Sequence, residues 1–226
     1  CMIIPAGPTE HRGGRGRNVT YGGYSPSYNS EMNVMEIATT GSAVDFGDAS
    51  DENDFGSGMA SATRGVFKQG RDGSSPYTTT MEFVTFSSLG GVADFGDDNG
   101  ILQDSSASSA NGIRGIFGNG TGYDTVIQSI TISTTGNATT FGTLSQGLYM
   151  GGGAGGASPT RGFFFGGRTA SPAVVVKTIE FVTFASGGAA TNFGDLTVAR
   201  RAIAAVTNNT RAVSCSGDTP ATNTMD

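Results

Sequence analysis

The chain is short of the residues from which many active sites are built. It contains no tryptophan, one histidine and two cysteines among its 226 residues. The single histidine, His11, excludes any copper site that needs two histidines. The two cysteines, Cys1 and Cys215, lie far apart in the sequence and make no disulfide framework.

Positive charge is scarce as well. Lys68 and Lys177 are the only lysines, and the formal net charge is −6. This balance argues against nucleic acid as the main partner, because that affinity needs clustered lysine and arginine. No run approaches the roughly 18 apolar residues of a membrane helix, so the sequence predicts no membrane span.

Helical patterns are also missing. The chain has 37 glycines, which punctuate short β-branched and aromatic runs. No window of about eleven residues shows apolar residues at helical spacing without an intervening glycine. The sequence therefore predicts an all-β fold.

What the chain does have is a repeat with a period near 50 residues. Five arginines mark it, separated by 47, 50, 47 and 50 residues, and a glycine follows each arginine six positions later. A Phe-Gly pair marks the four complete copies. These landmarks are Arg17, Arg64, Arg114, Arg161 and Arg211, and Phe46, Phe95, Phe141 and Phe193. Such a period predicts an array of one supersecondary unit.

The array is expected to form a single domain over residues 1–226. Its repeats are placed at 17–63, 64–113, 114–160 and 161–210, with a partial fifth at 211–226. Each unit holds a strand that begins at Met32 or its equivalent, where the apolar alternation shifts phase. That shift predicts a bulge or burial on both faces.

Three further strands complete the expected unit. A glycine nine residues after each anchor predicts a hairpin turn with positive φ, at Gly41, Gly90, Gly136 and Gly188. The returning strand directs its Phe-Gly phenylalanine into the core. The run that follows each arginine is another strand, and residues 201–206 exemplify the fourth.

Four short strands per unit are typical of a β-propeller blade, and here the chain resembles the kelch family. The matching residues are Arg200-Arg201, Arg161-Gly162, Gly166-Gly167 and Phe193. The resemblance implies a kelch-like β-propeller with four full repeats and a partial fifth. Phenylalanine replaces the usual tryptophan, and the Gly-Gly pair is intact only at 22–23 and 166–167.

The amino-acid sequence of the repeats, such as residues 178–201, is also similar to repeats in tail-fibre and other virion proteins of marine bacteriophages. This resemblance implies a structural protein of an extracellular virion, with a secreted or cell-surface protein as the alternative. Its partners would be other virion proteins or copies of itself. A five-bladed ring completed by residues 2–5 is the working model, and a piece of a longer array is the alternative.

No catalytic constellation is expected, so the chain is predicted not to be an enzyme. A sialidase-like arginine centre is the least favoured alternative. The repeated arginines are expected to tie neighbouring blades through backbone carbonyls or through Asp48, Asp97 and Asp195. No cofactor is predicted, although oxygen ligands in the acidic segments 48–54 and 97–99 leave calcium open.

The interpretation favoured for function is a structural or attachment protein of a virion, of tail-fibre or decoration type, and contact with host-surface glycans is an additional hypothesis. A cellular or secreted carbohydrate-binding propeller is the alternative. Segments 97–113 and 147–158 break the repeat and are expected to lie in loops on one face, which is the natural binding surface. Tyrosine rings in irregular segments can stack on sugars. The candidates are Tyr24, Tyr28, Tyr77 and Tyr123. This hypothesis requires these tyrosines to share a face and to be exposed.

Overall fold

In a computed structural model the protein is all-β. The described residues are 2–3, 16–24, 26–72, 77–101, 105–150, 158–207, 210–218 and 225, and they form strands, turns and irregular segments without a helix. Within these ranges there is accordingly no helix that could cross a membrane.

The first two sheets are four-stranded and antiparallel, and each runs in chain order. The first consists of β1 (Met2–Ile3), β2 (Arg17–Tyr24), β3 (Tyr28–Glu36) and β4 (Val44–Asp48). The second consists of β6 (Ser57–Ala60), β7 (Arg64–Lys68), β9 (Thr80–Thr85) and β10 (Ala93–Asp97). A short ribbon of β5 (Asn53–Asp54) and β8 (Arg71–Asp72) links them.

The later sheets repeat this plan with variations. The third contains β11 (Ala107–Ala110), β12 (Arg114–Gly118), β13 (Val126–Thr131) and β14 (Thr139–Thr143), and β17 (Gly188–Ala189) is added in parallel to β14. The fourth contains β15 (Arg161–Arg168), β16 (Val175–Thr183) and β18 (Thr191–Asp195). The fifth contains β19 (Ala204–Thr207) and β20 (Ala212–Cys215), with a bridge from Cys215 to Met225.

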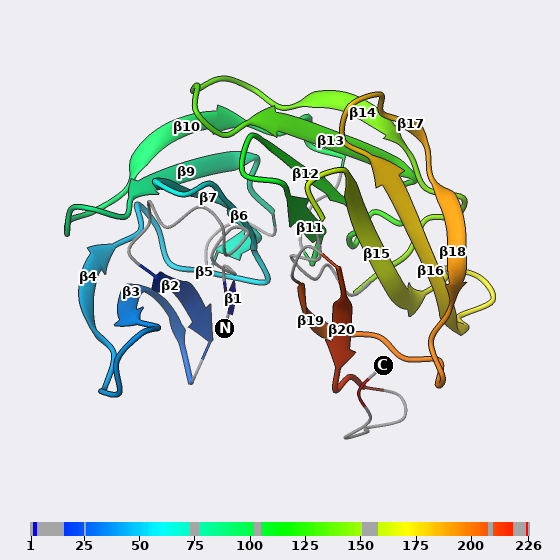
Figure 1. Cartoon of the computed structure of the whole chain (residues 1–226), viewed down its shortest axis with the longest axis horizontal. Coiled ribbons are helices and arrows are strands. Elements are labelled where there is room, and N and C mark those ends of the chain that lie inside the picture. The colour runs from blue at the N-terminus through cyan, green and yellow to red at the C-terminus, as the bar shows by residue number, and fades with distance from the viewer. Residues whose placement is uncertain are drawn as a thin grey trace.

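The five sheets lie side by side in an open arc (Figure 1). Strands β1, β6, β11 and β19 lie toward the middle, whereas β4, β10, β14 and β18 lie along the rim. No strand pairing within the described ranges joins the first sheet to the fifth, so these residues do not form the expected closed ring. We call the contact between two consecutive sheets a joint, and we number the joints from the N-terminus.

The predicted break in alternation of the third strand corresponds to burial on both faces in the second and third sheets. Adjacent residues Met81 and Glu82 are both buried in β9, as are Ile127 and Gln128 in β13. A β-bulge is present in all four copies, but its extra residue lies on the fourth strand. The extra residues are the phenylalanine landmarks Phe46, Phe95, Phe141 and Phe193.

Each joint has its own apolar core. At the second joint Met59, Phe95, Phe117 and Ile130 pack together from both sheets. Comparable clusters occupy the other three joints. The core is therefore distributed between neighbouring sheets, as expected for stacked repeats.

The phenylalanine landmark is buried only where a full sheet follows it. Phe46 and Phe95 are buried and Phe141 is half-buried, but Phe193 is 56% exposed. The prediction that all four rings enter the core is wrong for Phe193. In the earlier copies the next sheet's third strand covers the ring, and no such strand of the fifth sheet lies within the described residues.

Three of the five repeated arginines bind the backbone of the next sheet. Arg17 Nη1 donates to the Phe86 carbonyl at 2.5 Å, Arg64 Nη1 to that of Ile132 at 3.2 Å, and Arg114 Nη1 to that of Phe184. Of the two kinds of expected partner, these contacts show the carbonyls and not Asp48, Asp97 or Asp195, and Arg17 Nε also donates to Glu36 of its own sheet at 2.6 Å. Arg161 instead stacks over Phe181, with 4.4 Å between the guanidinium carbon and the ring centroid. Arg211 lies at an exposed position just before β20.

Glycines bring the rim of one sheet against the turn of the next. A Cβ at Gly47 would lie 2.6 Å from the Gly90 carbonyl carbon, and one at Gly96 would lie 2.6 Å from that of Gly136. Gly90, Gly136 and Gly188 have the predicted positive φ. Gly41 does not, and it belongs to the first of the described sheets.

Candidate ligand-binding face

The topology places two kinds of loop on one face of the arc. In an antiparallel sheet, the turn from the second to the third strand and the connection from the fourth strand leave from the same end. Contacts between these loops confirm the arrangement. They are the β5–β8 pairing and the bridges Tyr149–Arg168 and Arg201–Asp218. We call this surface the loop face.

All four predicted tyrosines lie on the loop face. Tyr24 and Tyr28 flank the turn between β2 and β3, Tyr77 precedes β9, and Tyr123 lies between β12 and β13. Tyr24 is 61% exposed and Tyr77 is 38% exposed, whereas Tyr28 and Tyr123 are half-buried. The structure brings together Tyr24 and Tyr28, with ring centroids 5.1 Å apart, and places Tyr123 at a different joint.

The first joint carries an aromatic cluster built around an arginine. The Arg71 guanidinium lies 5.7 Å from the Tyr28 ring centroid and 5.1 Å from that of Phe55. Arg71 also donates to both carboxylate oxygens of Asp54, at 3.3 and 3.1 Å. A bidentate pair fixes the plane of the guanidinium, and the rings stack on it. We call Tyr24, Tyr28, Asp54, Phe55 and Arg71 the first-joint cluster.

The third joint carries a second cluster of the same chemistry. Arg168 Nη2 donates to the Tyr123 hydroxyl at 2.8 Å, and its guanidinium lies 5.5 Å from the Tyr149 ring centroid. The two tyrosine rings are 5.8 Å apart. The hydrogen bond to Tyr123 raises the pKa of Arg168. We call Tyr123, Tyr149 and Arg168 the third-joint cluster.

The sequence interpretation missed Phe55, Arg71 and Arg168 as members of these clusters. Arg71 and Arg168 each lie seven residues after a repeat arginine, so alignment of the repeats could have identified them as equivalent. Their partners could not be found in this way, because the residues that pair with them come from loops of the neighbouring unit.

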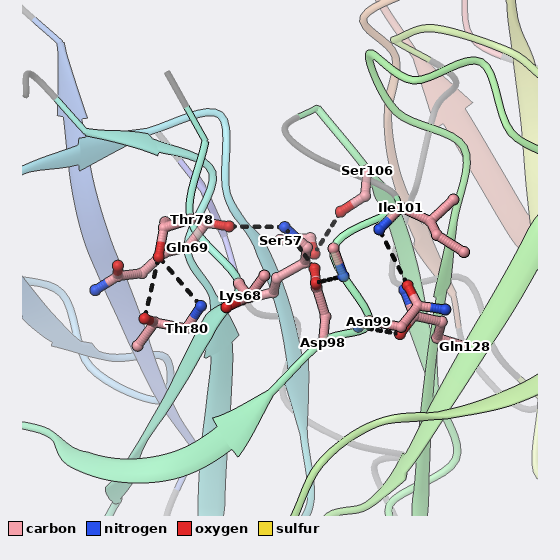
Figure 2. A network of polar contacts seen from close by, with 12 residues as sticks. Ser57, Lys68, Gln69, Thr78, Thr80, Asp98, Asn99, Ile101, Ser106 and Gln128 are labelled. Atoms are coloured by element: carbon pink, nitrogen blue, oxygen red, sulfur yellow. Dashed lines mark hydrogen bonds and ion pairs between the residues drawn. The ribbon is translucent and has the colours of Figure 1, made fainter. Parts of the chain in front are cut away.

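A buried polar network lies beneath the loop face at the second joint (Figure 2). Lys68 Nζ lies 3.1 Å from Asp98 Oδ2, and the two side chains are only 0% and 1% exposed. Lys68 also donates to the Gln69 carbonyl, and the backbone N–H of Asn99 donates to Gln128. The ion pair ties the end of β7 to the segment that leads from β10 to the next sheet, and so it stabilises the joint. Because solvent does not reach it, it cannot contact a ligand from outside.

Polar side chains at one repeat position also link neighbouring sheets at the first, second and third joints. Glu82, Gln128 and Glu180 follow the anchor residue of the third strand, and each accepts a backbone N–H from the loop after the preceding rim strand. Glu82 additionally accepts the Tyr21 hydroxyl at 2.6 Å. Burial, and then the charge of Glu82, raises the pKa of the Tyr21 phenol well above its usual range.

The acidic segments considered for calcium are already engaged in part. Asp54 pairs with Arg71, and Asp98 pairs with Lys68. Within the described ranges, no three side chains of the metal-binding types gather into a site. His11 and most of the glycine-rich segment 147–158 lie outside the described residues.

Comparison with known proteins shows the fold and nothing narrower. No protein-family model and no curated protein matches the chain. Among solved structures, 139 chains match. One is the structure of YjhT, with a TM-score of 0.70 at 12% identity, covering 93% of this chain and 76% of that one. At that identity the likeness is one of backbone arrangement.

Proposed function

We propose that this chain is a kelch-like β-propeller that acts without catalysis, as a virion attachment component that contacts host-surface glycans through its loop face. The observation that carries the proposal is the gathering of exposed aromatic side chains on that face. Tyr24, Phe55 and Tyr77 are all more than one-third exposed there. Exposed rings that gather on one face are a feature of binding surfaces. Phe193 is also exposed, but it lies on the rim strand β18 against Phe163 and Phe181 of its own sheet.

The propeller part of the proposal is supported by the arrangement of the sheets. They are antiparallel, run in chain order from the middle to the rim, and stack through one core per joint (Figure 1). These are features of propeller blades. The proposal that the protein belongs to a virion rests on the similarity of its repeat sequences to phage tail-fibre repeats.

Glycan binding is supported by the chemistry of the rings. The C–H face of a pyranose is apolar and carries partial positive charge, whereas the face of an aromatic ring is negative. Stacking therefore favours sugars over other polar ligands. In both clusters an arginine holds the rings in place before a ligand arrives, which reduces the ordering cost of binding.

The contacts of the arginines speak against a sialidase-like centre. Arg17, Arg64 and Arg114 are each bound to a backbone carbonyl of the next sheet, so they do not converge on one point. We expect no hydrolysis of a chromogenic sialoside. Hydrolysis by the wild-type chain that Arg64→Ala abolished would contradict the non-enzymatic proposal.

The direct test is binding of the purified chain to an immobilised glycan array. We expect selective binding that falls about tenfold in Tyr24→Ala, since a stacked ring contributes on the order of 1 kcal/mol. Leu89→Ala is the matched control, because Leu89 is 64% exposed but lies in a turn between the third and fourth strands, away from the loop face. An array without any bound glycan would refute the proposal.

A secreted carbohydrate-binding protein is the second candidate. It is favoured by the same exposed rings, because they serve either setting. Mass spectrometry of purified virus particles separates the two candidates. We expect peptides of this chain in the particles, and their absence would favour the secreted protein.

A further inference from the structure

The first-joint cluster offers a row of stacking surfaces. Tyr24 contacts Tyr28, Tyr28 faces Arg71, and Arg71 faces Phe55. The two ends of the row, Tyr24 and Phe55, are its most exposed rings, at 61% and 43%. Ligand units can therefore be accommodated at both ends at once, across the joint between the first and second sheets.

The ring of Phe55 is not required by the fold. Phe55 has φ +52, and the equivalent positions Ser105, Met150 and Ala202 have φ between +48 and +55. The backbone shape thus belongs to the repeat, and small or flexible side chains satisfy it elsewhere. A bulky residue in the left-handed region is costly, and such costs concentrate at functional positions.

The segment that carries Phe55 is clamped against its neighbours. A Cβ at Gly70 would lie 2.1 Å from the Asp54 carbonyl oxygen and 2.5 Å from the Phe55 carbonyl carbon. A Cβ at Gly22 would lie 2.7 Å from the Asn53 carbonyl oxygen. These two glycines let the segment approach the ends of β2 and β7 closely, so Phe55 is held beside Arg71.

The charges around the cluster select against an anion. Asp54 holds the guanidinium of Arg71 in a bidentate pair, so the pair adds no net charge. Asp51 and Glu52 are exposed in the same connection between β4 and β6, and the exposed Asp48 ends β4 just before it. Like charges facing a carboxylated or sulfated sugar would weaken its binding.

We infer that the first-joint cluster binds a linear neutral oligosaccharide, with sugar units stacked on Tyr24 and Phe55 and the Arg71–Asp54 pair holding the platform between them. This inference rests on the proposed glycan-binding function and narrows it to one site and one ligand class. The third-joint cluster, whose tyrosines are half-buried, is not the principal site.

Saturation-transfer NMR and calorimetric titration with defined sugars test the inference. The probes are neutral tetrasaccharides of glucose and mannose, the free monosaccharides, and an anionic tetragalacturonate. We expect at least one neutral tetrasaccharide to bind about tenfold or more tightly than its monosaccharide, because two rings engage it together. The anionic probe should bind more weakly than that neutral tetrasaccharide.

Phe55→Ser should reduce the affinity about tenfold while leaving the thermal midpoint unchanged, because Ser105 already occupies the equivalent position. Tyr24→Ala is the second variant, with the same expectation. Tyr149→Ala is the matched control in the third-joint cluster and should change the affinity less than about twofold.

Preferential binding of the anionic probe, or unchanged binding in both Phe55→Ser and Tyr24→Ala, would overturn the inference. If Tyr149→Ala alone abolished binding, the site assignment would fail and the proposed function would stand. If no glycan bound the wild-type chain on the array or in these titrations, both would fail.

Discussion

The second and fourth joints use the same repeat positions, but an ion pair occupies them at the second joint and apolar side chains occupy them at the fourth. At the second joint, Lys68 and Asp98 form a buried ion pair. At the fourth joint, the equivalent residues are Phe165 and Leu196, which share an apolar cluster with Ile203. One backbone position therefore accepts either a charge pair or an apolar contact, provided that both partners change together.

The two joints differ at their outer ends too. At the second joint, Arg64 binds a carbonyl across the joint and Phe95 is 1% exposed. At the fourth, Arg161 stacks only within its own sheet and Phe193 is exposed. The comparison shows that the landmark residues acquire their stabilising role only when a complete sheet follows them.

Breaking the ion pair gives the largest expected effect. Lys68→Ala leaves Asp98 charged and buried without its partner, so we expect a loss of about 3–5 kcal/mol in unfolding free energy. Urea denaturation measures it. The double variant Lys68→Met, Asp98→Leu imitates the fourth joint and should lie within about 1 kcal/mol of wild type. A double variant as unstable as Lys68→Ala would contradict the equivalence of the two joints.

Truncation of the landmark phenylalanine gives the next largest difference in stability between the two joints. Phe95→Ala removes a buried ring from the second core, and we expect a loss of about 3–4 kcal/mol. Phe193→Ala, at the equivalent exposed position, should cost less than about 1 kcal/mol. Thermal and urea unfolding of both variants measure the contrast, and equal losses would show that Phe193 is covered in solution.

A pH titration extends the comparison to the first joint, where Tyr21 stands at the position of Lys68. Above pH 10 or so the unfolded phenol loses its proton, whereas folded Tyr21, with its raised pKa, keeps it. The unfolded state then binds fewer protons, so stability falls by up to about 1.4 kcal/mol per pH unit.

Unfolding free energies measured by urea between about pH 8 and pH 11 bracket this transition. We expect Tyr21→Phe to flatten the alkaline fall in stability. Tyr24→Phe, on an exposed ring, is the control and should retain the fall. An unchanged slope in Tyr21→Phe would show that other groups govern it.

The arginines give the smallest difference. Arg64→Ala loses a charge-assisted hydrogen bond across the joint and its stacking on Phe83, and we expect a loss of about 1–2 kcal/mol. Arg161→Ala loses only stacking on Phe181, worth about 0.5–1 kcal/mol. Matched urea curves compare the two. A larger loss for Arg161→Ala would place an unrecognised partner against the fourth sheet.

The strands and three of the four hairpin glycines were predictable because they recur at equivalent positions of the repeat, whereas the bulge lies on the fourth strand and not on the third. Met32, Met81, Ile127 and Ile179 align, and their shared surroundings reveal local geometry without any knowledge of distant contacts. The open arc and the exposure of Phe193 were not predictable, because they depend on which sheet comes next in space.

The site was predictable only in part. Loop tyrosines can be read from the sequence, and all four lie on the expected face. The neighbourhood of Phe55 and Arg71 arises from the β5–β8 pairing, which joins loops of two units. Similarly, Lys68 and Asp98 are 30 residues apart, and the sequence does not show that they meet. Only the folded structure shows that both are buried and form an ion pair.

The glycine contacts along the rim have a consequence for how such a chain can vary. Any side chain at Gly47 or Gly96 would overlap the backbone of the adjacent turn, so substitution there disrupts the packing of one sheet against the next. On the loop face the position of Phe55 tolerates different side chains, since its equivalents in the other copies hold serine, methionine and alanine. Point mutations there can thus alter the side chains presented on the loop face while the spacing of the sheets stays fixed.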